Sequence, residues 1–161
     1  MIHQLQYRKI FLGTHAQIIE ALNWLDTILE EHELEPSIIF YLRLCFEELF
    51  TNIVKHGCVN NLNNSNLDQS NMGNNIIIDV NLSIAAEKLR LTLEDNSTPF
   101  DINAIPTSAI NKPLQQLKPG GLGIHLIKKI ADNLYYIPLN PGNKVVVEFN
   151  CTSSILQDER E

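Results

Sequence analysis

The sequence predicts a two-layer α/β sandwich in which a mixed β-sheet carries three helices on one face. The first supporting observation is the order of hydrophobic periods along the chain. Alternating segments, typical of strands, and longer segments with a helical period follow in the order strand, two helices, hairpin, helix, hairpin. The second is size: 161 residues with 44% hydrophobic side chains suffice for one domain, residues 1–161, with a sizeable core.

The first half of the chain contains one predicted strand and two predicted helices. Residues 4–12 alternate as a strand does. Thr14 can cap a helix over about 15–32. Pro36 suits the first turn of a second helix, which continues to Gly57.

The second half contains two pairs of strand-like runs, each predicting a hairpin. The first pair spans 76–84 and 88–94 and is joined by a short turn. The second pair spans 134–139 and 144–150 and is joined by the turn-forming residues Asn140-Pro141-Gly142-Asn143.

Three other segments lack the pattern of a regular element. An asparagine-rich stretch over about 58–75 predicts a loop. Repeated prolines over about 97–119 exclude a continuous helix and predict an extended lid. A third helix, roughly 122–132, follows it, and the tail 152–161 is expected to fray.

Composition excludes several classes of function. A net charge of −7 with no run of lysine or arginine argues against nucleic-acid binding. No apolar run approaches the length of a membrane span, so a soluble cytoplasmic protein is expected. Cys45, Cys58 and Cys151 lack metal-binding spacing and predict neither a zinc site nor a disulfide framework.

The second predicted helix has polar side chains beside its apolar stripe. Glu48 and Asn52 flank the stripe one turn apart, His56 continues their row, and Glu47 points to the opposite side. Unpaired burial would cost roughly 2–7 kcal/mol per polar group. Two interpretations of this polar row therefore remain open. It is either a functional site or a helix end whose polar groups simply reach water. The stripe itself consists of Ile38, Leu42, Cys45, Leu49 and Ile53.

Two further motifs are ambiguous when taken alone. The glycines in Pro119-Gly120-Gly121-Leu122-Gly123-Ile124 precede a helix, where unpaired N–H groups favour an anion such as phosphate. Such glycines also serve as caps or tight turns. Asp95 ends a strand, where it can form a turn or accept a hydrogen bond from the exocyclic amine of adenine.

Taken in this order, the motifs resemble those of the GHKL superfamily of ATP-binding domains. Within it, the chain is most similar to the anti-sigma factor serine/threonine kinases of bacterial partner-switching systems. The similarity covers about residues 5–150. The matching residues are Glu48, Asn52 and His56-Gly57 in the first motif, Asp95 and Pro99-Phe100-Asp101 in the second, and Gly121-Leu122-Gly123-Ile124-His125-Leu126-Ile127 in the third.

The resemblance implies a Bergerat-type ATP-binding fold that binds ATP or ADP with Mg²⁺. It implies that Asn52 binds the Mg²⁺, that Glu48 is the general base towards the attacking hydroxyl, and that Asp95 recognises the adenine amino group. The residues expected at the nucleotide are Asn52, His56, Asp95, Ser97, Phe100, Gly120, Gly121, Leu122, Gly123 and Ile124.

The chain departs from the family pattern in three places. Ser97 stands where the family has a glycine that gives the adenine room. Pro119 stands where some relatives have an arginine, with Lys118 nearby as a possible substitute. The last strand often supplies a threonine near the adenine, whereas Lys144-Val145-Val146-Val147 offers no hydroxyl.

The expected function is that of an ATP-dependent serine/threonine protein kinase acting as an anti-sigma or related regulatory factor. Its expected substrate is a serine of a STAS-domain antagonist, and its other expected partner is a sigma factor or another regulator. The resemblance also implies a homodimer.

The main alternative is a nucleotide-gated binding module with little or no kinase activity. Glu48 favours the enzyme, because pure binding needs no base. The catalytic domain of a sensor histidine kinase is disfavoured, because no helix with a phospho-acceptor histidine precedes the domain.

Overall fold

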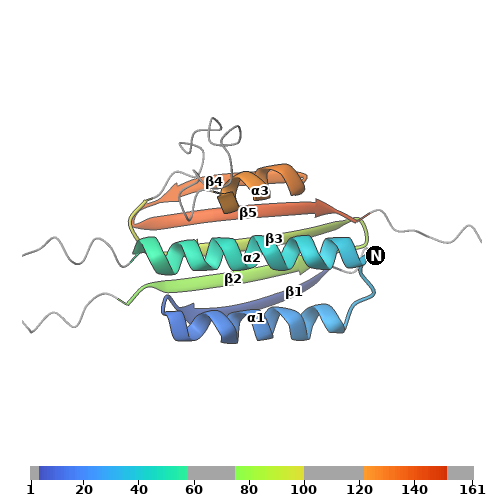
Figure 1. Ribbon diagram of the computed structural model, residues 1–161, viewed down its shortest axis with the longest axis horizontal. Helices are drawn as coiled ribbons and strands as arrows, with labels where there is room; N and C mark the ends of the chain where they lie inside the picture. The colour runs from blue at the N-terminus through green and yellow to red at the C-terminus, as the bar shows by residue number, and fades with distance from the viewer. Residues whose placement is uncertain (1–3, 58–74, 100–121, 152–161) are drawn as a thin grey trace, which may run out of the picture.

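The computed structural model describes residues 4–57, 75–99 and 122–151 (Figure 1). These ranges confirm the predicted order of elements, although α1 and α3 end at Glu30 and Ile130 rather than at 32 and 132. The elements are β1 (Leu5–Leu12), α1 (His15–Glu30), α2 (Pro36–Gly57), β2 (Ile77–Ile84), β3 (Lys88–Asp95), α3 (Leu122–Ile130), β4 (Asn133–Leu139) and β5 (Gly142–Asn150).

Three predicted segments fall wholly or almost wholly outside the described residues. They are the asparagine-rich loop over about 58–75, the lid over about 97–119 and the tail 152–161. These predictions therefore remain predictions.

The strands form one sheet in the order β1-β2-β3-β5-β4, and every neighbouring pair is antiparallel. The predicted α/β sandwich is confirmed, but the expectation of a mixed sheet is wrong for these strands. The physical reason is the path of the connections. After β3 the chain returns through α3 into β4, which runs parallel to β3 but lies at the sheet edge, and β5 then inserts between them. No two parallel strands are therefore neighbours among these five.

One face of the sheet supplies half of the hydrophobic core. Every second residue of the three central strands points to this face and is buried, as expected where a layer of helices covers an antiparallel sheet. α2 lies along the middle of the sheet and contacts both α1 and α3 (Figure 1). The buried strand residues on this face include Ile78, Val80, Leu82, Leu89, Leu91, Leu93, Val145, Val147 and Phe149.

The apolar stripe of α2 meets this sheet face as predicted. Leu42, Cys45 and Leu49 are buried, and Ile38 and Ile53 pack partly buried against them. Burial raises the pKa of the Cys45 thiol to about 12. Cys45 is therefore a core residue in its neutral form, as its place on the apolar stripe predicted.

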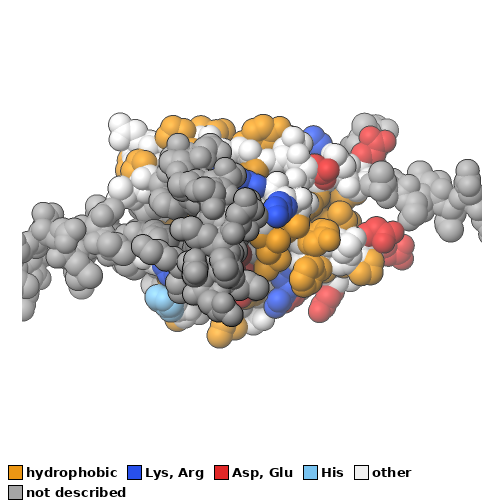
Figure 2. Space-filling view, turned by 45° about the horizontal axis from the view of Figure 1, so that its top comes forward, with side chains coloured by type: hydrophobic (Ala, Val, Ile, Leu, Met, Phe, Trp, Pro, Cys, Tyr) orange, Lys and Arg blue, Asp and Glu red, His pale blue; other side chains and the backbone are white. Residues whose placement is uncertain are grey.

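The outer surface of the described residues mixes hydrophobic and charged side chains. Figure 2 shows hydrophobic side chains in small groups, with lysine, arginine and acidic side chains between them. Ile10, Ile19 and Phe40 are among the most exposed large hydrophobic residues. None of the helices in the described ranges has the length and apolarity needed to cross a lipid bilayer.

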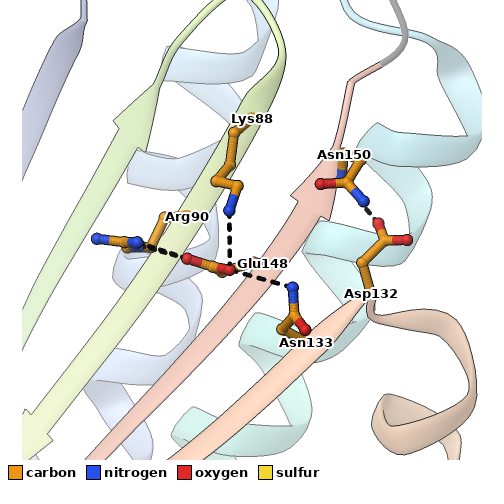
Figure 3. Close-up of polar contacts among 6 residues, drawn as sticks. All are labelled: Lys88, Arg90, Asp132, Asn133, Glu148 and Asn150. Atoms are coloured by element: carbon orange, nitrogen blue, oxygen red, sulfur yellow. Dashed lines mark hydrogen bonds and ion pairs between the residues drawn. The ribbon is translucent and has the colours of Figure 1, made fainter.

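The sheet face opposite the helices has a buried carboxylate near one end of the strands. Glu148 on β5 is only 3% exposed at its side chain. It accepts hydrogen bonds from Arg90 (2.7 Å) and Lys88 (3.2 Å) on β3 and from Asn133 (3.2 Å) on β4 (Figure 3). At the same end of the sheet, the Asn150 backbone N–H donates a hydrogen bond to the Asp132 side chain (2.7 Å). Glu148 thus ties three strands together.

We expect Glu148→Ala to lower the free energy of unfolding by about 1–3 kcal/mol, because it removes a buried acceptor shared by three donors. Burial alone would raise the pKa of Glu148, but hydrogen bonds from Arg90 and Lys88 outweigh it and hold the pKa below its ordinary value of 4.5. A group with a lowered folded-state pKa stabilises above its unfolded-state pKa, and this contribution disappears as the pH falls through the folded-state value. Wild type should therefore lose stability below about pH 4.5 more steeply than Glu148→Gln.

Chemical denaturation at pH 7 and at pH 3–4 measures both effects. Glu94→Ala is the matched control, because Glu94 lies on the same sheet face and pairs with Lys144 at 2.6 Å but is 41% exposed. It should lose less than half as much stability. Equal losses for the two variants would show that burial of Glu148 does not strengthen its contacts.

Candidate nucleotide-binding site

A pocket opens between α2, the start of α3 and the adjoining ends of β3 and β5. Its wall is mostly apolar with a few polar groups, the composition typical of small-molecule sites. The apolar side chains are those of Leu49, Ile53, Leu93, Ile124 and Val145, and the polar ones are those of Asn52, Asp95, Ser97, Thr98 and Asn143.

Asp95 is the last residue of β3 and is buried at the polar side of the pocket. Its Oδ1 accepts hydrogen bonds from the Ser97 backbone N–H (2.8 Å), the Ser97 hydroxyl and the Asn143 side-chain amide (3.0 Å). The bond to the Ser97 backbone is that of an Asx turn. Asp95 therefore forms a turn and also lines the pocket, so the two interpretations of this residue are compatible.

Asn143 is, together with Thr98, a polar wall residue that was not predicted from the sequence. The register of the sheet places it directly opposite Asp95, on β5. The preceding Gly142 has φ +117°, and a Cβ there would collide with the Asp95 carbonyl oxygen. Only glycine fits this close approach of the two strands. The sequence predicted Asn143 only as a turn residue, because no local pattern shows that it pairs with Asp95.

Asn52 lies in the pocket wall with an incompletely paired amide. It is 8% exposed, and its Nδ2 has no hydrogen-bond partner among the described residues. Leu49 and Ile53 of the same helix surround it as apolar wall residues. A buried amide without a partner costs about 1–3 kcal/mol. Such a cost is common at sites that are completed by a ligand.

Glu48, one helical turn before Asn52, lies against the first turn of α3. The side chain is partly buried, whereas the neighbouring Glu47 is exposed, as the helical pattern predicted. A Cβ added at Gly123 would collide with the Glu48 carboxylate, so the glycine permits this contact. The first N–H groups of a helix have no partner within it, and the helix dipole favours negative charge there.

The start of α3 carries the other predicted site residues that the structure describes. Ile124 is buried and lines the pocket, and Gly123 contacts Glu48. The neighbouring His125 is buried, and neither ring nitrogen has a partner in the described part of the chain.

Of the expected site residues, Asn52, Asp95, Ser97 and Ile124 line one pocket. Glu48 and Gly123 do not line it but contact each other at the start of α3. The other expected site residues lie outside the described residues or have undescribed side chains: His56, Phe100, Gly120, Gly121 and Leu122.

A family model described as the histidine kinase-like ATPase domain matches residues 11–149 of the chain. The chain belongs to this family. The match confirms the resemblance to GHKL domains, and it spans all the elements that form the pocket. Membership of the family implies nucleotide binding.

Two relatives of the chain are named as protein kinases. One is the serine/threonine-protein kinase BtrW of Bordetella bronchiseptica, 27% identical over 127 residues, which are 76% of this chain and 78% of the relative. The other is the serine-protein kinase RsbW of Bacillus cereus, 26% identical over 97 residues, which are 58% of this chain and 52% of the relative. Both are similar to this chain at low identity.

The residues present suit a nucleotide of the kind this family binds. The pocket offers apolar walls for a base and a carboxylate at one end for its amino group. Asn52 offers an amide that lacks a full set of partners. Gly123 has no side chain, and this leaves room for the Glu48 carboxylate against the start of α3.

We expect Asn52→Leu to leave the free energy of unfolding of the nucleotide-free protein unchanged or higher, because it replaces an unpaired buried amide by an apolar side chain of similar size. Asn143→Leu is the matched control, since it removes a paired amide from the same pocket and should cost about 1–3 kcal/mol. Urea denaturation without nucleotide measures both. A loss for Asn52→Leu as large as that for Asn143→Leu would show that the Asn52 amide is already satisfied.

Proposed function

We propose that this chain is an ATP-dependent serine/threonine protein kinase that acts as an anti-sigma or related regulator in a partner-switching system. Membership of the ATPase family and two relatives named as serine kinases support the proposal. The observation on which it chiefly rests is the position of Glu48. Its carboxylate is one helical turn from Asn52 and lies against the start of α3.

In this proposal the base of ATP occupies the pocket. Asp95 accepts a hydrogen bond from the amino group of adenine, and Ile53 and Ile124 contact the ring as apolar wall residues. The proposed phosphate-binding segment is Gly120 to Ile124, because unpaired N–H groups at a helix start favour anions.

Asn52 is the proposed protein ligand of Mg²⁺. Mg²⁺ retains several waters and takes few protein ligands, so one amide oxygen beside the phosphates is sufficient. When bound, the ion offsets the negative charge of the phosphate oxygens during transfer.

Glu48 is the proposed general base. A carboxylate near the transferred phosphoryl group can accept the proton of the attacking serine hydroxyl while the phosphates are held in place. Glu47, on the exposed side of the same helix, is excluded from this role by its position.

The proposed substrate is a serine of a STAS-domain antagonist protein. Phosphorylation of the antagonist would end its binding to the kinase, which would then sequester a sigma factor or another regulator. The protein is proposed to work as a homodimer in the cytoplasm, without direct contact with nucleic acid or membrane.

We expect Glu48→Gln to reduce phosphoryl transfer by about 10²–10⁴-fold, the usual contribution of a general base, while nucleotide binding persists. The assay incubates the protein with γ-labelled ATP and a STAS-domain protein from the same organism, and follows label on the antagonist. Glu47→Gln is the matched control and should transfer phosphate at nearly the wild-type rate.

Two outcomes would contradict this assignment. Equal transfer rates for wild type and Glu48→Gln would show that Glu48 is not the base. If wild type binds ATP and its partner but transfers no phosphate, the protein is instead a nucleotide-gated binding module.

A separate prediction tests the base pocket. Asp95→Asn should weaken ADP binding by about 10–150-fold, because a hydrogen bond to a charged acceptor contributes about 1.5–3 kcal/mol. Isothermal calorimetry measures the affinity. Asp79→Asn serves as the control, since Asp79 pairs with Arg8 on the opposite face of the sheet and should not affect binding. Unchanged ADP affinity in Asp95→Asn would remove Asp95 from the site.

A further inference from the structure

The two oxygens of Asp95 have different surroundings. Oδ1 accepts from the Ser97 backbone N–H, the Ser97 hydroxyl and the Asn143 amide, whereas Oδ2 accepts no hydrogen bond from any described residue. An ionised carboxylate oxygen has about two lone-pair sites for hydrogen bonds. Oδ1 is therefore saturated, and Oδ2 is the acceptor that Asp95 can offer to a ligand in the pocket.

A network of side chains holds the donors on Oδ1. The Asn143 Nδ2 lies 3.1 Å from the Thr98 carbonyl oxygen and 3.2 Å from the Ser97 hydroxyl as well as 3.0 Å from Asp95. A backbone carbonyl and a carboxylate can only accept, so the nitrogen of the amide must face them. The Tyr136 hydroxyl on β4 donates to the Asn143 Oδ1 at 2.9 Å, which fixes the other end of the amide.

Purine bases differ in the number of donors that they present to a carboxylate. Adenine presents one amino group beside a ring acceptor. Guanine presents two parallel donors, its ring N–H and its 2-amino group, which suit a carboxylate with both oxygens accessible. Hypoxanthine presents the ring N–H alone.

We propose that Ser97 and Asn143 are positioning residues that restrict Asp95 to a single accessible acceptor and thereby set a preference for adenine over guanine nucleotides. The inference rests on the proposed nucleotide site at Asp95. The second donor of a guanine in this pocket would find Oδ1 occupied, and an unpaired buried donor weakens binding by about 10–100-fold. Ser97, which departs from the glycine of the family pattern, then contributes to selectivity.

The test is a calorimetric titration of the full chain with ADP, GDP and IDP. The variant is the double substitution Ser97→Ala with Asn143→Leu, which leaves the Ser97 backbone N–H as the one remaining donor on Oδ1. We expect wild type to prefer ADP, and the double variant to lose about tenfold or more of its preference over GDP. The ratio of IDP to ADP affinity should stay constant, because hypoxanthine has no second donor to gain.

Two further variants separate selectivity from damage to the fold. Tyr136→Phe removes only the hydroxyl that orients Asn143, and its preference for ADP over GDP should fall by about two- to tenfold. Asn133→Leu removes an amide of β4 that contacts Glu148 on the opposite sheet face, so its nucleotide preference should equal that of wild type.

An unchanged ratio of ADP to GDP affinity in the double variant would overturn the inference and leave the proposed function standing. Equal weakening of all three nucleotides would also overturn it, because Ser97 and Asn143 would then have only a structural role. Failure of the unmodified protein to bind ADP would overturn the proposed function, and the inference with it.

Discussion

The register between β3 and β5 determines the geometry of the whole site. It places Asp95 opposite Asn143 at the ends of two central strands, on the face that the helices cover. Gly142 makes this possible, since its positive φ and missing Cβ let the backbone of β5 approach the Asp95 carbonyl. A shift of β5 by one residue would turn Asn143 to the other face. Asp95 would then lose its partner, and the pocket would lose one of its polar groups.

α2 is the second determinant, because one helix contributes both to the core and to the pocket. Its apolar stripe covers the sheet, while Glu48 and Asn52 stand at the border of that stripe. The core therefore positions the two polar residues, and the unpaired amide of Asn52 is a cost that the buried stripe offsets. On the other face of the sheet, Glu148 ties β3, β4 and β5 together at the end of β3 and β5 that lies away from the pocket.

Much of the fold and half of the site could be predicted from sequence, because they depend on local patterns. Helical spacing is sufficient to align Glu48 with Asn52, and a strand end is sufficient to place Asp95. The antiparallel sheet was missed because strand adjacency depends on where a crossover returns, which no local pattern encodes. Asn143 was missed for the same reason: its partner is set by a pairing between residues far apart in sequence. The burial of Glu148 could not be predicted for the same reason, because it depends on contacts among three strands.

The central claim is that the meeting ends of β3 and β5 form the base site beneath α2. A crystal structure of the protein with a non-hydrolysable ATP analogue tests it most directly. Our account predicts the adenine amino group within hydrogen-bond distance of Asp95 Oδ2, Oδ1 still bonded to Ser97 and Asn143, and the phosphates at the start of α3. A base bound elsewhere, or an amino group bonded to Oδ1 in place of Asn143, would contradict it.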